Sequence, residues 1–421
     1  MNRKTDPPDR CQTAWPLGTA IVLLSACGVF ATSASAQTVL RTHMGATDNE
    51  SLGTATAGIG DIDGDTAPDY AVGSPYADNG GIEAGQVILY SGASGATLHT
   101  LPGGMSELAF GHSIAGLGDI TGDGIPDLVV GGPTHGASAF PGRARAYSGA
   151  DFSLLHEWIS SNVGDDFADQ VGRAGDLNGD GIEDIAIFAP GDHAPGPGGH
   201  NGQLYTYSGA NYQLLWSMLG NHLGGPEIGG IAPMGDTNAD GYGDLLVWGP
   251  LHQDAALNPI GRMNILSGVD ASVLRTWVGT PTDVFGYAAT SLEDANGDGI
   301  CDAAMVSRYE TTPGTFVYGL WLFSGADGQV LAHAPNQPEA ISYQSFKGLG
   351  DMTGDGVPDF VSKVQAFPER FQVRSSADLQ VRYEILAQGQ GEQSLASPSF
   401  LGDINGDGIA EWTAGAPLQG S

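Results

Sequence analysis

The chain has 421 residues, of which 66 are glycine and 24 are proline, a composition that favours short strands joined by many turns. Its 48 acidic residues outnumber its 15 basic residues, and the formal net charge of −33 argues against a nucleic-acid partner, whose phosphates it would repel. At this length the chain could hold two or three domains, unless a repeat organises it as one array.

The N-terminus has the features of an export signal. Three basic residues precede an apolar run from about residue 14 to residue 31, and Ala34-Ser35-Ala36 forms a signal-peptidase site before Gln37. The apolar run is too short for a confident membrane span, so we expect no transmembrane segment once residues 1–36 are removed. We therefore predict a protein that is secreted or held at the cell surface or in the periplasm, with residues 37–421 as its mature domain.

A second cleavage pattern overlaps the first. Leu24-Ser25-Ala26-Cys27 resembles the lipobox of bacterial lipoproteins, and on that alternative Cys27 would carry a lipid anchor. Ordinary cleavage would remove both Cys11 and Cys27, leaving Cys301 alone and excluding a disulfide within the chain. The domain must then be held by its core, by closure of its fold and by bound metal.

Seven copies of an acidic nonapeptide follow the leader. The copy at residues 119–127 reads Asp-Ile-Thr-Gly-Asp-Gly-Ile-Pro-Asp, with oxygen-bearing side chains at positions 1, 3, 5 and 9 and glycines at positions 4 and 6. The copies begin at residues 61, 119, 176, 236, 294, 351 and 403, which are 52 to 60 residues apart. A period of this length is the signature of a repeat architecture.

Alternating oxygens around a glycine turn are what a hard cation such as calcium requires. An EF-hand does not fit, because position 12 is never acidic in these copies and the flanking residues are strand-like. Position 9 must then bind directly, together with the backbone carbonyl of position 7, and the cation would neutralise carboxylates that otherwise repel one another. The sequence therefore predicts up to seven Ca²⁺ sites. The expected ligands are Asp61, Asp63, Asp65, Asp69, Asp119, Thr121, Asp123, Ile125, Asp127, Asp176, Asn178, Asp180, Ile182, Asp184, Asp236, Asn238, Asp240, Tyr242, Asp244, Asp294, Asn296, Asp298, Ile300, Asp302, Asp351, Thr353, Asp355, Val357, Asp359, Asp403, Asn405, Asp407, Ile409 and Glu411.

Each repeat contains four strand-like segments. In the second repeat we expect strands at residues 112–118, 127–131, 142–148 and 152–158, with the acidic turn between the first two. The third strand and its turn recur as clearly as the acidic loop, for example Gly-Gln-Val-Ile-Leu-Tyr-Ser-Gly-Ala at residues 85–93. Repeated four-stranded antiparallel units predict an all-β fold, a seven-bladed β-propeller, in preference to a linear solenoid with polar capping repeats.

The two ends of the chain are complementary. Residues 38–42 align with the fourth strand of the first repeat, so the chain enters on a last strand that would join the seventh blade and close the ring. The seventh repeat stops one strand past its acidic loop, without a third strand of the Gly-x-Val-x-x-Tyr-Ser-Gly type. Either the sequence is truncated, which we favour, or the seventh blade is one strand short.

The pattern resembles the FG-GAP repeat of integrin α-subunit propellers and their bacterial relatives. Phe110-Gly111 with Gly131-Gly132-Pro133, and Gly415-Ala416-Pro417, match the residues that give the repeat its name. The resemblance covers essentially residues 37–421. It implies a seven-bladed propeller with calcium in the hairpins between strands one and two, and a role in binding or adhesion.

Several loops depart from the family pattern. Thr66 replaces the position-6 glycine, Thr121 and Thr353 replace Asp or Asn at position 3, and Glu411 replaces the final Asp. We expect loops two, six and seven to bind calcium more weakly for that reason. Ala239, in place of a glycine in loop four, we expect to be harmless.

The loops between strands two and three would lie on the face opposite the acidic turns, which carries ligand in the integrin resemblance. Some of these loops contain histidine, and we expect unrelated polar residues rather than a converging site for metal or an anionic group. These histidines are His135, His193, His200 and His252. Three tryptophans stand near matching ends of strand four, where we expect packing between blades rather than sugar stacking. They are Trp158, Trp216 and Trp277.

No common catalytic signature is found in the sequence: neither a Gly-x-Ser-x-Gly elbow, nor His-Glu-x-x-His, Cys-x-x-Cys or a P-loop. We therefore predict a non-enzymatic, exported, calcium-binding propeller that binds an extracellular protein or glycan, with calcium in a structural role. Two alternatives stay open because propellers also host enzymes: an extracellular hydrolase or lyase acting on polymers, and a structural part of a surface assembly.

Overall fold

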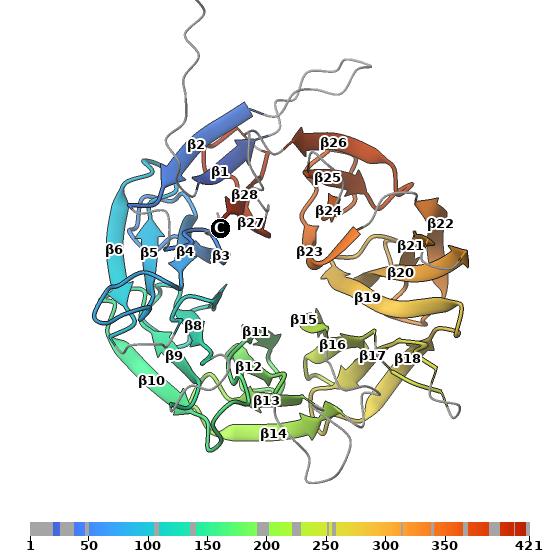
Figure 1. The fold of residues 1–421 in the computed structure, drawn as a ribbon, viewed down its shortest axis with the longest axis horizontal. Helices are drawn as coiled ribbons and strands as arrows, with labels where there is room; N and C mark the ends of the chain where they lie inside the picture. Colours follow the sequence, from blue (N-terminus) through green and yellow to red (C-terminus); the bar gives the residue numbers. More distant parts are fainter. Residues whose placement is uncertain are drawn as a thin grey trace, which may run out of the picture.

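The strands of this protein form a ring of four-stranded antiparallel sheets, the blades of a β-propeller (Figure 1). The structure is a computed structural model, and it describes residues 20–25, 38–46, 50–104, 109–134, 140–191, 202–220, 229–250, 252–254, 258–312, 315–337, 341–364, 369–386, 396–407 and 409–417. The all-β propeller that the repeat predicts is confirmed. Among the described residues, no helix is both long and apolar enough to cross a bilayer.

Six blades are each built from four consecutive strands. Blade one contains β3 (Thr56–Gly60), β4 (Asp69–Ser74), β5 (Gln86–Tyr90) and β6 (Thr97–Pro102), and blade two contains β7 (Ser113–Gly116), β8 (Leu128–Gly132), β9 (Arg143–Tyr147) and β10 (Leu154–Ile159). Blade three contains β11 (Gln170–Gly175), β12 (Asp184–Ala189), β13 (Gln203–Tyr207) and β14 (Leu214–Leu219), and blade four contains β15 (Gly230–Gly235), β16 (Asp244–Gly249), β17 (Arg262–Ser267) and β18 (Val273–Val278). Blade five contains β19 (Asp283–Leu292), β20 (Asp302–Thr312), β21 (Thr315–Phe323) and β22 (Val330–Gln337), and blade six contains β23 (Ile341–Leu349), β24 (Asp359–Val364), β25 (Arg370–Ser375) and β26 (Val381–Leu386).

A further sheet, here called the composite sheet, joins the two ends of the chain. Its order is β2-β1-β28-β27, with β27 (Ala396–Gly402) and β28 (Glu411–Ala416) from the last repeat, β2 (Thr38–Met44) at the outer edge and β1 (Ala20–Ser25) between them. Consecutive strands thus form six blades rather than the predicted seven. The expected closure by residues 38–42 is confirmed through β2. The third-strand position, which we expected to be missing, holds β1 from the expected leader.

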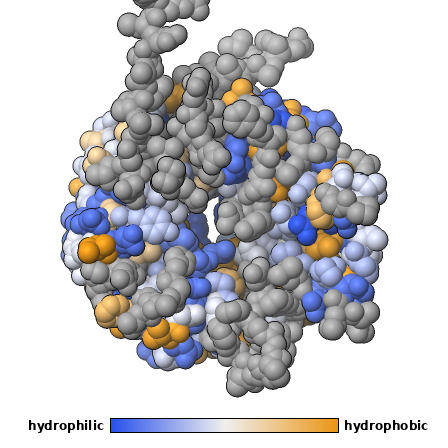
Figure 2. All heavy atoms as spheres, viewed as in Figure 1, coloured by the Kyte–Doolittle hydropathy of each residue, from blue (hydrophilic) through white to orange (hydrophobic). Residues whose placement is uncertain are grey.

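The first strand of each blade lies nearest the centre of the ring, and the fourth strand lies at the rim (Figure 1). The inner strand β27 contacts both β3 and β23, so the composite sheet closes the ring between blades six and one. In the space-filling view a narrow opening remains at the centre, bordered mainly by hydrophilic residues (Figure 2).

The core is divided into clusters between neighbouring sheets. Every residue of β4, β8, β12, β16, β24 and β28 is buried, because the second strand of a blade is packed on both faces. Val87, Phe110 and Leu128, for example, belong to one cluster that joins blades one and two. Burial on both faces explains why these strands are nearly continuous apolar runs.

The predicted strands of blade two lie within two residues of those observed. The sequence missed the extended hairpin of blade five, where β20 and β21 are 11 and 9 residues long. Both strands run past the usual length on the side opposite the acidic loop.

Candidate functional site

Each acidic nonapeptide connects the inner strand of a sheet to the second strand. Acidic loop one, residues 61–69, joins β3 to β4, and loop seven, residues 403–411, joins β27 to β28. Because this connection is the same in every sheet, all seven loops fall on one face of the ring. The predicted position of the loops is therefore observed.

The first carboxylate of each loop curls the backbone around itself. In loop one, Asp61 Oδ1 accepts hydrogen bonds from the amides of Gly64 at 2.7 Å and Asp65 at 3.2 Å, and its Oδ2 accepts one from Thr66 at 2.8 Å. Equivalent bonds form at Asp294, and they hold the pKa of that carboxyl below its ordinary value. The carboxylate of position 1 thus holds the turn in its curled form.

The tight turn requires left-handed backbone conformations. Gly64 and Gly122 have φ of 79° at position 4, where glycine adopts such angles without a steric penalty. Thr66 and Ala239 stand at sites where other copies have glycine, and they take φ of 76° and 62°. Both substitutions are accommodated by the same turn, at a cost of about 1 kcal/mol each for a side chain in this region.

Loop one brings three carboxylates together. Oxygens of Asp61, Asp63 and Asp65 lie within 4.8 Å of one another, which is the one such group among the described residues. Carboxylates at this separation repel one another unless a cation lies between them. Loop one thus has the most negative predicted set of ligands.

Other loops replace the position-3 carboxylate with an amide. Asn238 and Asn296 each donate from Nδ2 to the position-5 carboxylates of Asp240 and Asp298, both at 2.9 Å. A bound cation would replace this contact by turning the amide oxygen toward the shared centre. Positions 3 and 5 of these two loops are thus in contact, and their binding of a metal ion stays a prediction.

Position 9 has a different environment from the other three positions. Asp69 is fully buried; its Oδ2 accepts the amide of Ile62 at 2.8 Å, and its Oδ1 accepts the amide of Gly92 at 2.7 Å. Burial raises the pKa of Asp69 to about 6. Asp69 is not part of the group that loop one brings together, so direct metal binding by position 9 stays a prediction.

The partner of position 9 is the turn that follows the third strand, here called the Ser-Gly turn. Five loops make this bond: Asp69 to Gly92, Asp127 to Gly149, Asp184 to Gly209, Asp244 to Gly268 and Asp302 to Gly325, at 2.7 to 3.3 Å. Both motifs can be recognised in the sequence, but the contact between them cannot. The signal was the recurring Ser-Gly that accompanies acidic loops one to five at nearly constant separation.

Blade six lacks this connection for a steric reason. A Cβ on Gly92 would lie 1.9 Å from the carbonyl oxygen of Pro68, so only glycine allows the turn to approach the loop. Blade six has Ser376 at this place, and its amide does not bond to Asp359 in the described structure. Ser376 Oγ is also buried without a partner among the described residues.

The arrangement of loop oxygens fits a hard divalent cation. All side-chain ligand candidates coordinate through oxygen, position 5 is exposed at the loop surface while position 1 is half-buried in most loops, and the backbone already has the required curl.

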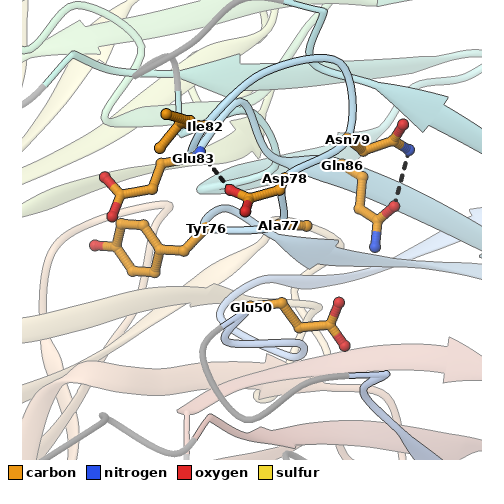
Figure 3. Close-up of a pocket in the computed structure, with 8 residues that line it drawn as sticks. All are labelled: Glu50, Tyr76, Ala77, Asp78, Asn79, Ile82, Glu83 and Gln86. Atoms are coloured by element: carbon orange, nitrogen blue, oxygen red, sulfur yellow. Dashed lines mark hydrogen bonds between the residues drawn. The ribbon is translucent and has the colours of Figure 1, made fainter.

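The opposite face has a cavity of about 580 Å³ in blade one. It lies beside the loop between β4 and β5, where the side chains of Tyr76 and Ile82 are 41% and 71% exposed (Figure 3). Asp78 Oδ1 accepts the amide of Glu83 at 2.9 Å, which folds the loop back on itself. The remaining lining residues are Glu50, Ala77, Asn79 and Gln86, with Asn79 Nδ2 donating to Gln86 Oε1 at 2.9 Å.

The histidine-bearing loops give no support for a converging site. His135, His193 and His200 lie outside the described residues. His252 Nε2 lies 2.5 Å from an η nitrogen of Arg262, within its own blade. The cavity of blade one was missed because its loop contains no histidine and no recognisable motif.

The tryptophans lie between blades, as expected. Trp158 is buried among residues of blades two and three. Trp216 Nε1 donates to the carbonyl oxygen of Gly268 at 2.7 Å, and Trp277 Nε1 donates to that of Gly328 at 3.0 Å. Trp216 stands two residues earlier along its strand than the other two, so the expected equivalence of all three was wrong.

Comparisons with known proteins agree with this architecture. A model of the FG-GAP repeat matches residues 110–150 and 170–207, which contain the first three strands of blades two and three. Integrin alpha-V of Gallus gallus is 27% identical over 269 residues, covering 58% of this chain and 25% of that protein. Integrin alpha-PS2 of Drosophila melanogaster is 30% identical over 242 residues, covering 52% of this chain and 16% of that protein. This chain therefore matches only a minor part of the length of these relatives.

A solved structure has a similar fold. The crystal structure of BBS1N in complex with ARL6DN, soaked with mercury, superimposes with a TM-score of 0.52 and covers 89% of this chain and 94% of that one. At 8% identity this likeness concerns the fold alone. The matched repeats and the integrin relatives support an FG-GAP repeat protein with an integrin α-like β-propeller.

Proposed function

We propose that this protein is an exported, calcium-loaded propeller that acts as a binding or adhesion module for an extracellular protein or glycan. The observation that carries the proposal is the convergence of Asp61, Asp63 and Asp65 within a glycine turn that six further loops repeat. The leader pattern and the likeness to integrin α-subunits support the extracellular location.

The side-chain oxygens of positions 1, 3 and 5, with the carbonyl of position 7, would hold the ion. Calcium would neutralise the carboxylates and thereby fix each hairpin against its blade. The chain itself supplies the curled loop and the buried position-9 carboxylate, which joins the loop to the Ser-Gly turn. In this proposal the acidic face gives rigidity, and the opposite face is free to bind a partner.

The cavity of blade one is the best candidate for partner contact on that opposite face. Exposed Tyr76 and Ile82 offer apolar and aromatic surface, while Asp78 and Glu83 add carboxylates beside them. This combination suits a sugar ring, which stacks on aromatic side chains and bonds to carboxylates, or a basic peptide side chain.

A thermal melt of residues 37–421 with calcium and with chelator tests the metal part. We expect a clear loss of melting temperature in chelator, restored by calcium, together with several bound ions per chain by elemental analysis. Magnesium at the same concentration should restore less, because it demands a smaller octahedral site. An unchanged melt with no bound metal would contradict the calcium role.

Binding to a glycan array and to a panel of extracellular matrix proteins tests the partner. We expect a ligand found in this way to bind Tyr76→Ala at least about tenfold more weakly, the size of a typical aromatic contact at an interface. Leu154→Ala, which truncates a residue 51% exposed at the rim of the ring, is the matched control and should bind normally. Equal loss in both variants would place the contact elsewhere.

A further inference from the structure

The long hairpin of blade five reaches further than its counterparts on the face opposite the acidic loops. The other second strands have five or six residues, whereas β20 has 11 and its partner β21 has 9. At a rise of about 3.3 Å per residue, Arg308 lies roughly 20 Å along β20 from Asp302, the last residue of acidic loop five. Physiological salt screens charges over roughly 8 Å, so the acidic loops contribute little to the potential at Arg308.

The guanidinium of Arg308 has no hydrogen-bond acceptor and no carboxylate partner among the described residues. It lies instead against two aromatic rings, with Cζ 4.9 Å from the ring centroid of Tyr287 on β19 and 4.7 Å from that of Phe316 on β21. Every other arginine in the described part of the chain has a hydrogen-bond or ion-pair partner. In a chain with 48 acidic residues, an arginine without an acceptor calls for a role outside the fold.

The two rings hold the guanidinium without using its N–H groups. A cation is attracted to the face of an aromatic ring, but the ring face offers no lone pair to an N–H donor. Tyr287 is itself fixed against Tyr318, which is 6% exposed and belongs to a core cluster, with ring centroids 5.7 Å apart. The rings come from the strands on either side of β20. The guanidinium is therefore positioned in advance, and a ligand would bind it at a small cost in entropy.

The available donors of Arg308 suit a single carboxylate. A guanidinium presents a planar fork of N–H groups that matches both oxygens of a carboxylate. A polyanion fits less well, because the protein has a net charge of −33 and exposed Glu310 stands two residues further along, on the same face of the strand. The surroundings of Arg308 therefore favour one carboxylate over a sulfated polysaccharide.

The end of the same hairpin, residues 310–312 and 315–317, is here called the hairpin tip. β19 pairs with β20 only as far as Tyr309, and β22 pairs with β21 only as far as Tyr318. In the described structure, the hairpin tip thus pairs within itself and has no strand on either outer edge. An extended peptide can add to such an edge through its own backbone, whereas a sugar cannot. These open edges beside Arg308 favour a polypeptide as the source of the carboxylate.

We propose that the hairpin tip binds an extended segment of another polypeptide, and that the carboxylate of an Asp or Glu side chain in this segment accepts hydrogen bonds from Arg308. The backbone of the segment would pair with the hairpin tip, and its acidic side chain would lie over the sheet against the guanidinium. The proposal rests on the proposed binding role, for which it names a partner class and a contact. It uses neither the calcium loops nor the cavity of blade one.

The test uses the full chain in calcium and two blocked peptides, acetyl-Thr-Val-Glu-Val-Thr-amide and the same peptide with Gln in place of Glu. Saturation-transfer NMR detects the weak binding expected of one ion pair and a short edge, with a Kd on the order of 1 mM. We expect the Gln peptide to bind at least about tenfold more weakly, because it lacks the charge that strengthens hydrogen bonds to a guanidinium. Hydrogen exchange of the hairpin-tip amides should slow when the Glu peptide is present at about ten times its Kd.

Variants of the clamp identify the contact. Arg308→Gln should abolish the difference between the two peptides, and Arg308→Lys should recover only part of it, because an ammonium group lacks the planar fork. Phe316→Ala, which removes an exposed ring, should weaken binding of the Glu peptide about twofold to fivefold through loss of a cation–π contact. Arg143→Gln is the matched control. It removes the same charge from blade two, where Arg143 bonds to Glu157 at 2.9 Å, and should leave the binding of both peptides unchanged.

Equal binding of the two peptides, or equal loss in Arg308→Gln and Arg143→Gln, would overturn the proposal. Tighter binding of N-acetylneuraminate, an acidic sugar with one carboxylate, than of the Glu peptide would overturn the choice of a polypeptide. Unchanged hydrogen exchange at the hairpin tip would do the same. If a partner from the binding panel is weakened by Tyr76→Ala but not by Arg308→Gln, the proposed function holds and this inference fails.

Discussion

The carboxylate of Asp69 and the amide of Gly92 are joined by a 2.7 Å hydrogen bond that connects the acidic hairpin of blade one to its Ser-Gly turn. The same bond recurs in four other blades. It makes the last carboxylate of the loop part of the fold itself, with or without a metal ion. Three of the expectations below follow from this contact and its neighbours.

Removing a position-9 carboxylate should destabilise the protein even in chelator. Asp184→Ala leaves the buried amides of Leu177 and Gly209 without their acceptor, and we expect a loss of about 2 to 4 kcal/mol in the free energy of unfolding. Asp180→Ala, at the exposed position 5 of the same loop, should cost less than about 1 kcal/mol under these conditions. Denaturant titration with chelator measures both. Equal effects would mean that position 9 acts only through metal.

Placing a glycine at residue 376 of blade six should stabilise the protein. Ser376→Gly removes the Cβ that keeps the turn away from loop six, allowing its amide to bond to Asp359. We expect a gain of about 1 kcal/mol, after the entropy cost of a glycine. Gly149→Ser is the reverse change in blade two and should destabilise by at least about 1 kcal/mol, because a Cβ there would lie 1.9 Å from Pro126 O. A Ser376→Gly protein that melts earlier would contradict the steric account.

Removing one negative charge from loop one should raise the melting temperature in chelator and lower it in limiting calcium. Asp63→Asn gives loop one the position-3 amide found in other loops and relieves repulsion among its three carboxylates. In chelator we expect the melting temperature to rise slightly, by the equivalent of a few tenths of a kcal/mol. In limiting calcium we expect weaker binding and a lower melting temperature than in wild type. Asp78→Asn, on the opposite face, should show no such reversal.

The histidine of the ring closure should make stability depend on pH. Burial, and then the charge of Arg41, lower the pKa of His43 below its ordinary 6.5. The unfolded chain therefore binds a proton more readily, and the contribution of His43 to stability is lost as pH falls below 6.5. His43→Gln should abolish this pH-dependent contribution to stability. The difference in unfolding free energy between wild type and variant should therefore shrink from pH 8 to pH 5. A constant difference would exclude the effect, and Val39→Ala, on the exposed face of the same strand, is the control.

The tryptophans of the fourth strands should differ in how much they stabilise the protein, because only some of them have a hydrogen-bond acceptor for Nε1. Trp216→Phe loses the bond from Nε1 to Gly268 in the next blade, and we expect a cost of about 1 kcal/mol beyond that of the smaller ring. Trp158 Nε1 is buried without an acceptor among the described residues, so Trp158→Phe should cost less. Chemical denaturation of both variants in the same calcium concentration makes the comparison. A costlier Trp158→Phe would show that packing outweighs the hydrogen bond.

The repeat predicted the blades well because each copy is one complete supersecondary unit. Acidic loop, apolar second strand and Ser-Gly turn lie in fixed order, so strand positions in blade two could be placed to within two residues. Ring closure by residues 38–42 could also be predicted from the sequence, since that segment matches a fourth strand and lacks a blade of its own. The filling of the third-strand position of the composite sheet by Ala20–Ser25 could not be predicted, because backbone pairing in that register has no local sequence signal.

The roles within the acidic loops were only partly predictable. Aspartate suits both a metal ligand and a buried acceptor of backbone amides, so the sequence alone could not separate Asp61 from Asp69. What separates them is the turn at Gly92, which is 23 residues further along the chain. The cavity at Tyr76 was missed for a related reason, since its residues carry no motif and only the folded loop brings them together.

The close approach of Gly92 to Pro68 restricts where copies of this repeat can diverge. A side chain at that glycine prevents the contact between hairpin and turn, as Ser376 does in blade six, so a copy that keeps the contact must keep the glycine. The loops between second and third strands meet a similar limit at the glycine just before the third strand, for example Gly85 and Gly261, whose Cβ atoms would lie 2.2 Å from Phe110 O and 1.9 Å from Phe285 O. Gene duplication followed by drift would therefore leave these glycines in place and allow each blade to acquire its own residues elsewhere in its loops.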